Sequence, residues 1–160
     1  MSENGRKPTV VIVDNNVAEM KQIKAFLERE TGFDVQTFTD PAESERFFES
    51  HPVDVGISDC SVAQTNGLQL LKRLKEIQPE SSRVLLTGCV DVTIAVEAIN
   101  EVALFQYLQK PCDDEQLLLA VRSAAERSRL LRELREKIEQ LDSAHITLKT
   151  AQQRLIHAFL

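Results

Sequence analysis

Four polar side chains stand directly after apolar runs that are typical of buried strands: Asp14, Asp59, Thr87 and Lys110. The carboxyl ends of parallel strands meet at one edge of an open α/β sheet, which is where ligands bind and chemistry occurs. Asp59 therefore stands where a reactive carboxylate would be. Each side chain alone is more often a cap or a solvated strand end, so only the set of four indicates a shared pocket.

The apolar pattern predicts five strands that alternate with helices. The expected strands cover residues 9–13, 33–38, 53–57, 83–87 and 104–108. Helical spacing follows each of them, with starts marked by Asp40-Pro41 and by Asp113, and stops marked by Gly32 and Pro79. This alternation predicts an α/β fold in which helices cover both faces of a parallel sheet.

Composition narrows the class of protein. The chain has 160 residues, of which 28% are charged and 42% hydrophobic, as expected for one globular domain. It has neither an apolar leader nor a membrane-length apolar run, so we expect a cytoplasmic protein without a membrane partner. Residues 1–112 hold 11 basic and 17 acidic side chains and residues 113–160 hold 8 of each, with no basic stripe for nucleic acid. Residues 1–8 are expected to be disordered.

Four short motifs occur in a fixed order along the chain. They are Val13-Asp14-Asn15, Ile57-Ser58-Asp59 with Gly67 eight residues later, Leu86-Thr87-Gly88, and Tyr107 three residues before Lys110-Pro111. With these motifs the chain resembles a CheY-like receiver domain of two-component response regulators, over residues 9 to about 125. The resemblance implies a flavodoxin-like, doubly wound five-stranded parallel sheet of order 2-1-3-4-5 with a long C-terminal helix.

The resemblance also assigns roles to individual residues. Asp59 would accept a phosphoryl group from a sensor histidine kinase or a phosphotransfer protein, and Thr87 and Lys110 would contact its oxygens. Mg²⁺ would be held by Asp14, Asn15, Asp59 and the backbone carbonyl of Ser61. Tyr107 would change rotamer and remodel the face formed by the fourth helix, fifth strand and fifth helix. The Lys110–Pro111 bond is expected to be cis.

Asn15 is the main departure from the family pattern, which usually has a second acid there. A missing unit charge at ~4 Å removes about 4 kcal/mol of attraction at an effective dielectric of 20, so we expect weak Mg²⁺ binding. Ala63 replaces a common Pro and would loosen the loop after Asp59. Ser61 and Cys89 occupy positions that tune phosphoryl lifetime in such domains, and the sequence does not give that lifetime.

Three cysteines, Cys60, Cys89 and Cys112, each follow a functional strand end by one or two residues. Their spacing fits neither a disulfide framework nor a zinc site. We interpret them as small hydrophobic residues rather than as redox or metal groups.

Residues 128–160 follow a second pattern, with leucines at every seventh residue: Leu134, Leu141, Leu148 and Leu155. Leu131, Ile138, His145, Gln152 and Phe159 interleave with them at the a positions. This heptad favours a parallel dimeric coiled coil over an amphipathic helix folded back on residues 9–127. Lys137 and Asp142 are spaced to pair across that dimer, and His145 would fix its register.

The last helix is expected to run unbroken from Asp113, because no Gly or Pro follows that residue. Its first seam, from Leu117 to Ser128, meets the heptad through a stammer, which would overwind the helix locally. The chain ends in mid-pattern, so residues 128–160 would form a dimerising coiled coil or a linker to an output domain absent from this chain.

The leading hypothesis is a non-enzymatic phosphoacceptor that relays a kinase signal into a coiled coil. The alternative is a degenerate receiver that acts as a phosphorylation-independent dimerisation or interaction module, an interpretation supported by Asn15. A hydrolase is a weaker hypothesis, because Asp59-Cys60-Ser61 lacks the second Asp that aspartyl phosphohydrolases use. The cognate kinase and the output activity are beyond the sequence.

Overall fold

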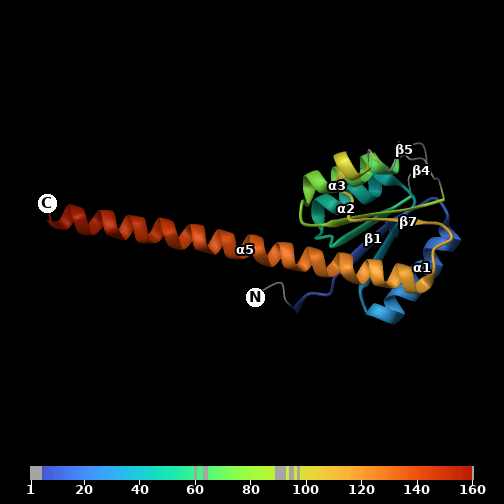
Figure 1. Ribbon diagram of the computed structural model, residues 1–160, viewed down its shortest axis with the longest axis horizontal. Helices are drawn as coiled ribbons and strands as arrows, with labels where there is room; N and C mark the ends of the chain where they lie inside the picture. The colour runs from blue at the N-terminus through green and yellow to red at the C-terminus, as the bar shows by residue number, and fades with distance from the viewer. Residues whose placement is uncertain are drawn as a thin grey trace. The chain divides into compact units, whose positions relative to one another are not determined.

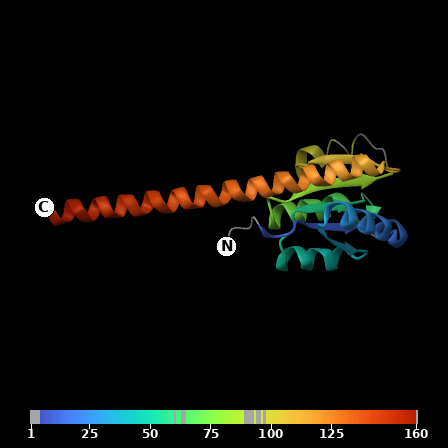
Figure 2. The ribbon, with the colours of Figure 1, turned by 90° about the horizontal axis from the view of Figure 1, so that it is seen from below.

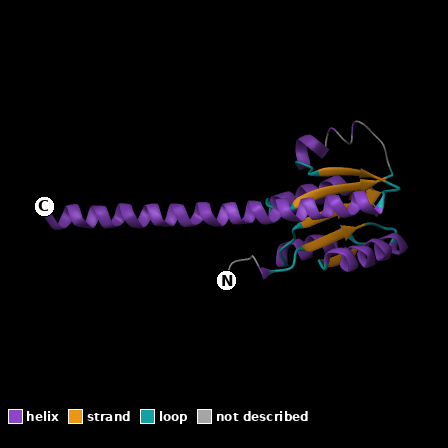
Figure 3. Ribbon diagram, turned by 60° about the horizontal axis from the view of Figure 1, so that its bottom comes forward, coloured by secondary structure: helices purple, strands orange, loops and turns teal. Residues whose placement is uncertain are grey.

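Five parallel strands form the central sheet of the computed structural model, which describes residues 5–59, 61–62, 65–88, 93, 96 and 98–159. The strands are β1 (Thr9–Val13), β2 (Asp34–Phe38), β3 (Val55–Ser58), β6 (Ser82–Thr87) and β7 (Gln106–Gln109). Their order is β2-β1-β3-β6-β7, with every neighbouring pair parallel (Figure 3). Since β6 and β7 are the fourth and fifth strands of this sheet in chain order, the predicted five-stranded α/β sheet of order 2-1-3-4-5 is confirmed.

Helices cover both faces of this sheet (Figures 1 and 2). They are α1 (Val17–Thr31), α2 (Pro41–Ser50), α3 (Gly67–Ile77) and α5 (Asp114–Phe159). The buried side chains of α1 and of the first part of α5 share one core cluster with Val10, Ile57 and Leu108 of the sheet. Buried side chains of α2 (Phe48) and α3 (Leu70 and Leu74) form a second cluster with Val11 and Val13. Alternate residues of β1 therefore contribute to opposite cores, as expected of a strand buried on both faces.

Local sequence explains where the first two helices begin and end. The side chain of Asn16 caps α1 by accepting a hydrogen bond from the Glu19 amide, and Gly32 ends that helix in the left-handed region at φ 72°. Asp40 caps α2, and Pro41 occupies its first turn. The ends at Gly32 and Asp40-Pro41 agree with the sequence expectations, whereas the cap at Asn16 was not predicted.

Two segments differ from the sequence expectations. The loop before α3 contains a short antiparallel hairpin, β4 (Ser61–Val62) with β5 (Thr65–Asn66), which is too short to leave a periodic signal. The fourth helix, predicted from 94–99, ends as a π-helix over Ala98–Val102, called η2. Apolar spacing does not distinguish π from α turns, and residues 94 and 95 lie outside the described part of the chain.

The chain divides into two compact units, Met1–Arg129 and Leu130–Leu160. The helix α5 is continuous from Asp114 to Phe159, as expected from the lack of Gly and Pro. Its first seam packs in the core, since Leu117, Val121 and Ser128 are all buried. Among the described helices, none is both long and apolar enough to cross a membrane.

Asp54 organises the edge of the sheet where β1 and β3 begin. Its carboxylate accepts hydrogen bonds from the Thr9 amide at 2.7 Å and from Arg6 at 3.1 Å. Its backbone carbonyl accepts from the buried Ser128 hydroxyl of α5, which also lies 2.9 Å from the Ser82 hydroxyl. A buried polar network therefore fixes this part of α5 against β3 and β6.

Arg83 is a buried cation at the same edge, with only 2% of its surface exposed. Its guanidinium donates to the carbonyls of Val102 (2.9 Å), Ala103 (3.4 Å) and Ser81 (2.8 Å). Burial, and then the nearby charge of Arg127, lower the pKa of Arg83 to about 10. Cations are favourable at helix C-termini, so Arg83 holds the end of η2, where Ala103 has a φ of 50°.

Replacement of Arg83 should destabilise the protein strongly. Arg83→Ala is expected to lower the free energy of unfolding by about 3 kcal/mol, because buried carbonyls would lose their donors. Arg29→Ala is the matched control, since Arg29 is an exposed arginine paired with Glu30, and should change it by less than about 0.5 kcal/mol. Urea denaturation measures both, and equal effects would contradict the capping role.

Candidate functional site

Lys110 joins the two predicted acids at the carboxyl edge of the sheet. Its ammonium lies 2.7 Å from Asp14 Oδ2 and 3.0 Å from Asp59 Oδ2. These three residues come from the ends of β1, β3 and β7, which are distant in sequence. The pocket inferred from four strand ends is therefore formed around one lysine and two carboxylates.

Backbone hydrogen bonds between neighbouring strand ends hold these residues in place. The amide of Asp14 donates to the Phe38 carbonyl, and that of Asp59 donates to the Val13 carbonyl, both at 3.2 Å. The Lys110 amide donates to the Thr87 carbonyl at 3.0 Å. The sheet ladder thus extends by one residue beyond each strand and fixes the spacing of the site.

The site carries excess negative charge in a partly desolvated setting. The Asp14 side chain is 6% exposed, that of Asp59 is 17% exposed and that of Lys110 is 18% exposed. Burial lowers the pKa of Lys110, but hydrogen bonds and charge from Asp14 and Asp59 outweigh burial and raise it well above its usual value. The lysine is therefore a permanent cation near neutral pH, available to a phosphoryl oxygen as a point charge.

Gly67 allows the chain to pass close to Asp59. A Cβ on Gly67 would lie 1.7 Å from the Asp59 carbonyl oxygen and 2.8 Å from Ser58 Oγ. Real Cβ atoms do not approach backbone so closely, so any side chain here would displace the Asp59 backbone. This close approach gives a physical reason for a glycine eight residues after Asp59.

The structure also places the four other residues that the resemblance assigned to the site: Thr87, Asn15, Ser61 and Tyr107. Thr87 is buried at the end of β6, joined to Lys110 through its backbone, whereas Asn15 is exposed beside Asp14. Ser61 begins β4, two residues after Asp59. Tyr107 is half-buried and packs against a separate cluster that includes Leu85 and Val102. The Lys110–Pro111 bond is cis, as predicted.

Glu19 belongs to the site and is absent from the sequence prediction. Both of its carboxylate oxygens lie 3.3 Å from Lys110 Nζ. It occupies the third position of α1, where the Asn16 side chain accepts from its amide and donates to its carboxylate. This is the spacing of a capping box, so an acid three residues after Asn16 was the available signal.

The donor set fits a magnesium ion by its chemistry. Asp14 and Asp59 provide carboxylate oxygens, which Mg²⁺ prefers, and the Ser61 carbonyl is close in sequence. Within the described residues, no group of three or more His, Cys, Asp or Glu side chains is arranged to hold a metal. Mg²⁺ usually takes only one or two carboxylates and keeps several waters, so a two-carboxylate site meets its requirement.

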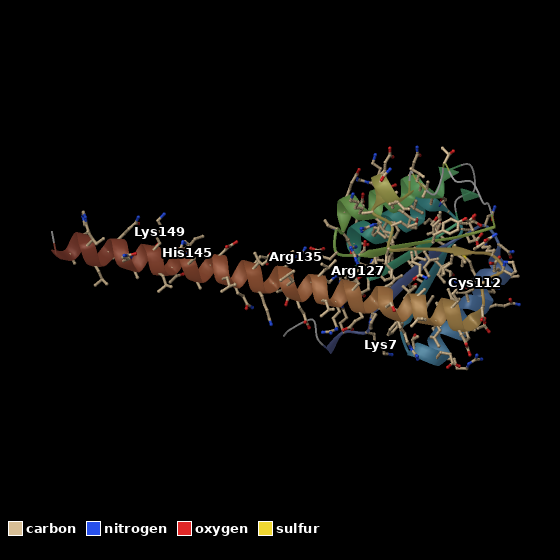
Figure 4. All side chains as sticks on the ribbon, viewed as in Figure 1. Lys7, Cys112, Arg127, Arg135, His145 and Lys149 are labelled. Atoms are coloured by element: carbon tan, nitrogen blue, oxygen red, sulfur yellow. The ribbon has the colours of Figure 1, made fainter. Side chains whose placement is uncertain are left out.

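Cys112 follows Lys110 by two residues (Figure 4). Of the three cysteines considered in the sequence analysis, it is the one that lies within the described part of the chain. It lines a groove of about 500 Å³ together with Phe26 and Pro111, beside Lys110. Burial, and then the negative charges of Asp113 and Asp114, raise the pKa of its thiol. Since the thiolate is the reactive and metal-binding form, this setting supports the interpretation of Cys112 as a small hydrophobic residue. Cys60 and Cys89 lie outside the described residues.

Comparison with known proteins identifies relatives of this chain. The sequence model for the response regulator receiver domain matches residues 10–122. The hydrogenase transcriptional regulatory protein HoxA of Cupriavidus necator is 27% identical over 96% of this chain, which covers 32% of HoxA. The chain spans about a third or less of the length of the curated relatives HoxA and DctD that it matches.

Solved structures show the same fold at moderate sequence identity. The signal receiver domain of an HD domain-containing protein from Pseudomonas fluorescens Pf-5 is 32% identical, with a TM-score of 0.73, covering 77% of this chain and 98% of that one. The beryllofluoride-activated NtrC4 receiver domain dimer is 28% identical, with a TM-score of 0.70, covering 75% of this chain and 98% of that one.

Gly67→Ala should disturb both the stability and the geometry of the site. Displacing the Asp59 carbonyl is expected to lower the free energy of unfolding by about 2 kcal/mol, in the range of overpacked cores. Gly5→Ala is the control, because a Cβ at Gly5 meets nothing within 4 Å. Thermal denaturation with an NMR spectrum of each variant would test this, and an unchanged Asp59 amide resonance in Gly67→Ala would contradict it.

Proposed function

Because the chain belongs to the response-regulator receiver family, we propose that Asp59 accepts a phosphoryl group from a histidine kinase or a phosphotransfer protein. One observation carries the proposal: the Lys110 ammonium lies 2.7 Å from Asp14 and 3.0 Å from Asp59. That arrangement supports a role for Asp59 as the nucleophile, with a second acid and a cation beside it at one edge of the sheet. Asp59 is the acid that ends the central strand β3.

In the transfer, an oxygen of Asp59 attacks the phosphorus of the donor phosphohistidine. The new O–P bond forms as the P–N bond breaks, and the electron pair of that bond returns to the histidine ring. Lys110 then exchanges its contact with Asp59 for a phosphoryl oxygen, which keeps the ammonium paired. No proton needs to be removed from Asp59, since a carboxylate is already ionised near neutral pH.

Asp14, Asn15, Asp59 and the Ser61 carbonyl would hold Mg²⁺. When bound, this ion offsets the repulsion between carboxylate and phosphoryl oxygens. The neutral amide of Asn15 leaves one charge fewer than a second acid would supply, and weak binding of the metal follows. Lys110 also competes for the same carboxylate oxygens of Asp14 and Asp59.

The signal leaves through Thr87 and Tyr107. Donation from the Thr87 hydroxyl to the phosphoryl group would draw the end of β6 toward Asp59. Tyr107 pairs with Leu85 of β6 in the sheet and packs near Val102 of η2, so movement of β6 reaches its ring directly. The face formed by η2, β7 and the start of α5 is the surface that changes.

Phosphorylation at Asp59 is tested by intact-mass spectrometry after treatment with acetyl phosphate and Mg²⁺. The parent chain should gain one phosphoryl group, and Asp59→Asn should gain none. Asp40→Asn is the matched control, because Asp40 is an exposed acid that caps α2, and should be labelled like the parent.

Label that persists in Asp59→Asn would show that another residue is the acceptor. If the parent gains no label from acetyl phosphate or from a phosphorylated histidine phosphotransfer protein, the phosphorylation-independent interaction module replaces this proposal.

The second unit is proposed to form a parallel homodimer. The described apolar heptad side chains from Leu134 onward are exposed in a single chain, from 49% at Ile138 to 70% at Leu148. His145 lies among them at an a position (Figure 4). Apolar residues repeated every seven positions along one helix match a second copy of the same helix, which buries them as knobs in holes. The signal would then continue along α5 toward an output domain, since the curated relatives are about three times as long.

Light scattering tests the homodimer. The full chain should be a dimer, whereas Leu141→Asp with Leu148→Asp, or a chain that ends at Arg127, should be a monomer or a much weaker dimer. Gln140→Asp with Thr147→Asp is the control, since it adds the same charges outside the a and d positions. Variants of the seam that remain as firmly dimeric as the parent would show that the first unit holds the dimer.

A further inference from the structure

Glu19 contacts the site lysine from an element that the proposed chemistry does not use. Its two carboxylate oxygens lie 3.3 Å from Lys110 Nζ, and its side chain is only 30% exposed. Asn16 fixes its direction by donating to Glu19 Oε2 at 3.2 Å. Glu19 therefore has a defined position, set by the first turn of α1, and it faces the ammonium rather than solvent.

The charges around Lys110 explain why this third acid matters. Asp14 and Asp59 bind the ammonium through the same carboxylate oxygens that a divalent cation would take. A cation at those oxygens would weaken the attraction that keeps Lys110 in the pocket. Glu19 would remain as an anionic partner on the α1 side, so that Lys110 stays beside Asp59 when the metal arrives.

Asn15 makes this role specific to the present chain. A neutral and exposed amide stands at the position next to Asp14, so the loop after β1 contributes one carboxylate. Glu19 returns a negative charge to the pocket from α1, five residues after Asp14. The site thus holds three carboxylates around one ammonium even though the second acid of the motif is absent.

We infer that Glu19 is a positioning residue of the receiver site: it supplies the charge that Asn15 lacks and keeps Lys110 directed at Asp59 while Mg²⁺ occupies the acids. This inference rests on the proposed phosphoacceptor function. A merely structural role for Glu19 would be to cap α1 together with Asn16. Gln keeps the backbone donation to Asn16 Oδ1 and a side-chain oxygen that accepts from Asn16 Nδ2, but it removes the charge, so Glu19→Gln separates the two roles.

The experiment compares four purified full-length chains: the parent, Glu19→Gln, Glu19→Gln with Asn15→Asp, and Glu28→Gln. Glu28 is the matched control, because it lies near the other end of α1, pairs with Lys24, and gives the same change in net charge. Isothermal titration with Mg²⁺ alone gives the affinity of each unphosphorylated chain. Mass spectrometry at saturating Mg²⁺ gives the rate of phosphorylation by acetyl phosphate.

Glu19→Gln should bind Mg²⁺ about fivefold more weakly, because one negative charge is lost and Lys110 turns fully to Asp14 and Asp59. Its phosphorylation should slow by about tenfold even at saturating Mg²⁺, because Lys110 is no longer held in position. Adding Asn15→Asp should restore Mg²⁺ affinity to at least the parent value. Glu28→Gln should match the parent in both measurements.

Parent-like behaviour of Glu19→Gln would reduce Glu19 to a helix cap and overturn the inference. An equal loss in Glu28→Gln would assign the effect to net charge, and failure of Asn15→Asp to restore affinity would show that the two positions do not substitute for each other. Each of these two results would also overturn the inference that Glu19 positions Lys110. If the parent binds Mg²⁺ but takes no phosphoryl group, the proposed function fails, whereas the pattern of Mg²⁺ affinities still decides whether Glu19 supplies the missing charge.

Discussion

The arrangement of charges at the carboxyl edge of the sheet follows from the mutual repulsion of its carboxylates. Asp14 and Asp59 end adjacent parallel strands, and neither is well solvated. Lys110 offsets this repulsion by binding both acids at once, and Glu19 adds a further negative charge beside it. Two like charges in one pocket are unfavourable without a cation, and the Lys110 ammonium is the cation that offsets them in this structure.

The opposite edge of the sheet is held by a different kind of interaction. There, Arg83 and Asp54 are buried and satisfied by backbone groups, and Ser128 ties α5 to the start of β3. The strand β6 connects the two edges, since Arg83 lies near its beginning and Thr87 ends it. A shift of Thr87 toward Asp59 would therefore act on a strand whose other end is anchored to η2 by Arg83, which limits how the movement spreads.

The C-terminal helix follows two packing patterns in turn. Up to Ser128 its apolar seam is buried against the sheet, and from Leu134 onward the apolar side chains repeat in heptads and are exposed in a single chain. The change of pattern occurs close to the boundary between the two compact units at Arg129 and Leu130. One continuous helix thus carries a buried seam in the first unit and an exposed apolar heptad seam in the second.

Local sequence patterns were sufficient to predict the five strands of the main sheet and three of the residues that meet at the site. Alternation of apolar runs with helical spacing predicted the five parallel strands, and polar residues at the strand ends predicted that Asp14, Asp59 and Lys110 would meet. Local chemistry was sufficient there, because strand ends converge in any parallel sheet of this kind. The predicted cap Asp40 is equally local, since it acts on its own helix.

Three features could be seen only in the folded chain: the place of Glu19 at the site, the π-helical turn η2, and the burial of Arg83. The contact between Glu19 and Lys110 joins residues 91 positions apart. The spacing after Asn16 marks Glu19 as a residue of the helix start, but it does not show that Glu19 faces that lysine. The sequence also did not predict the π-helix η2 or the contact of Arg83 with its C-terminal end, since a charged residue in a strand is normally expected to be exposed. In both cases the outcome depends on which groups lie next to a charged side chain in the folded chain. Tertiary packing brings these groups together, and local sequence propensity does not predict it.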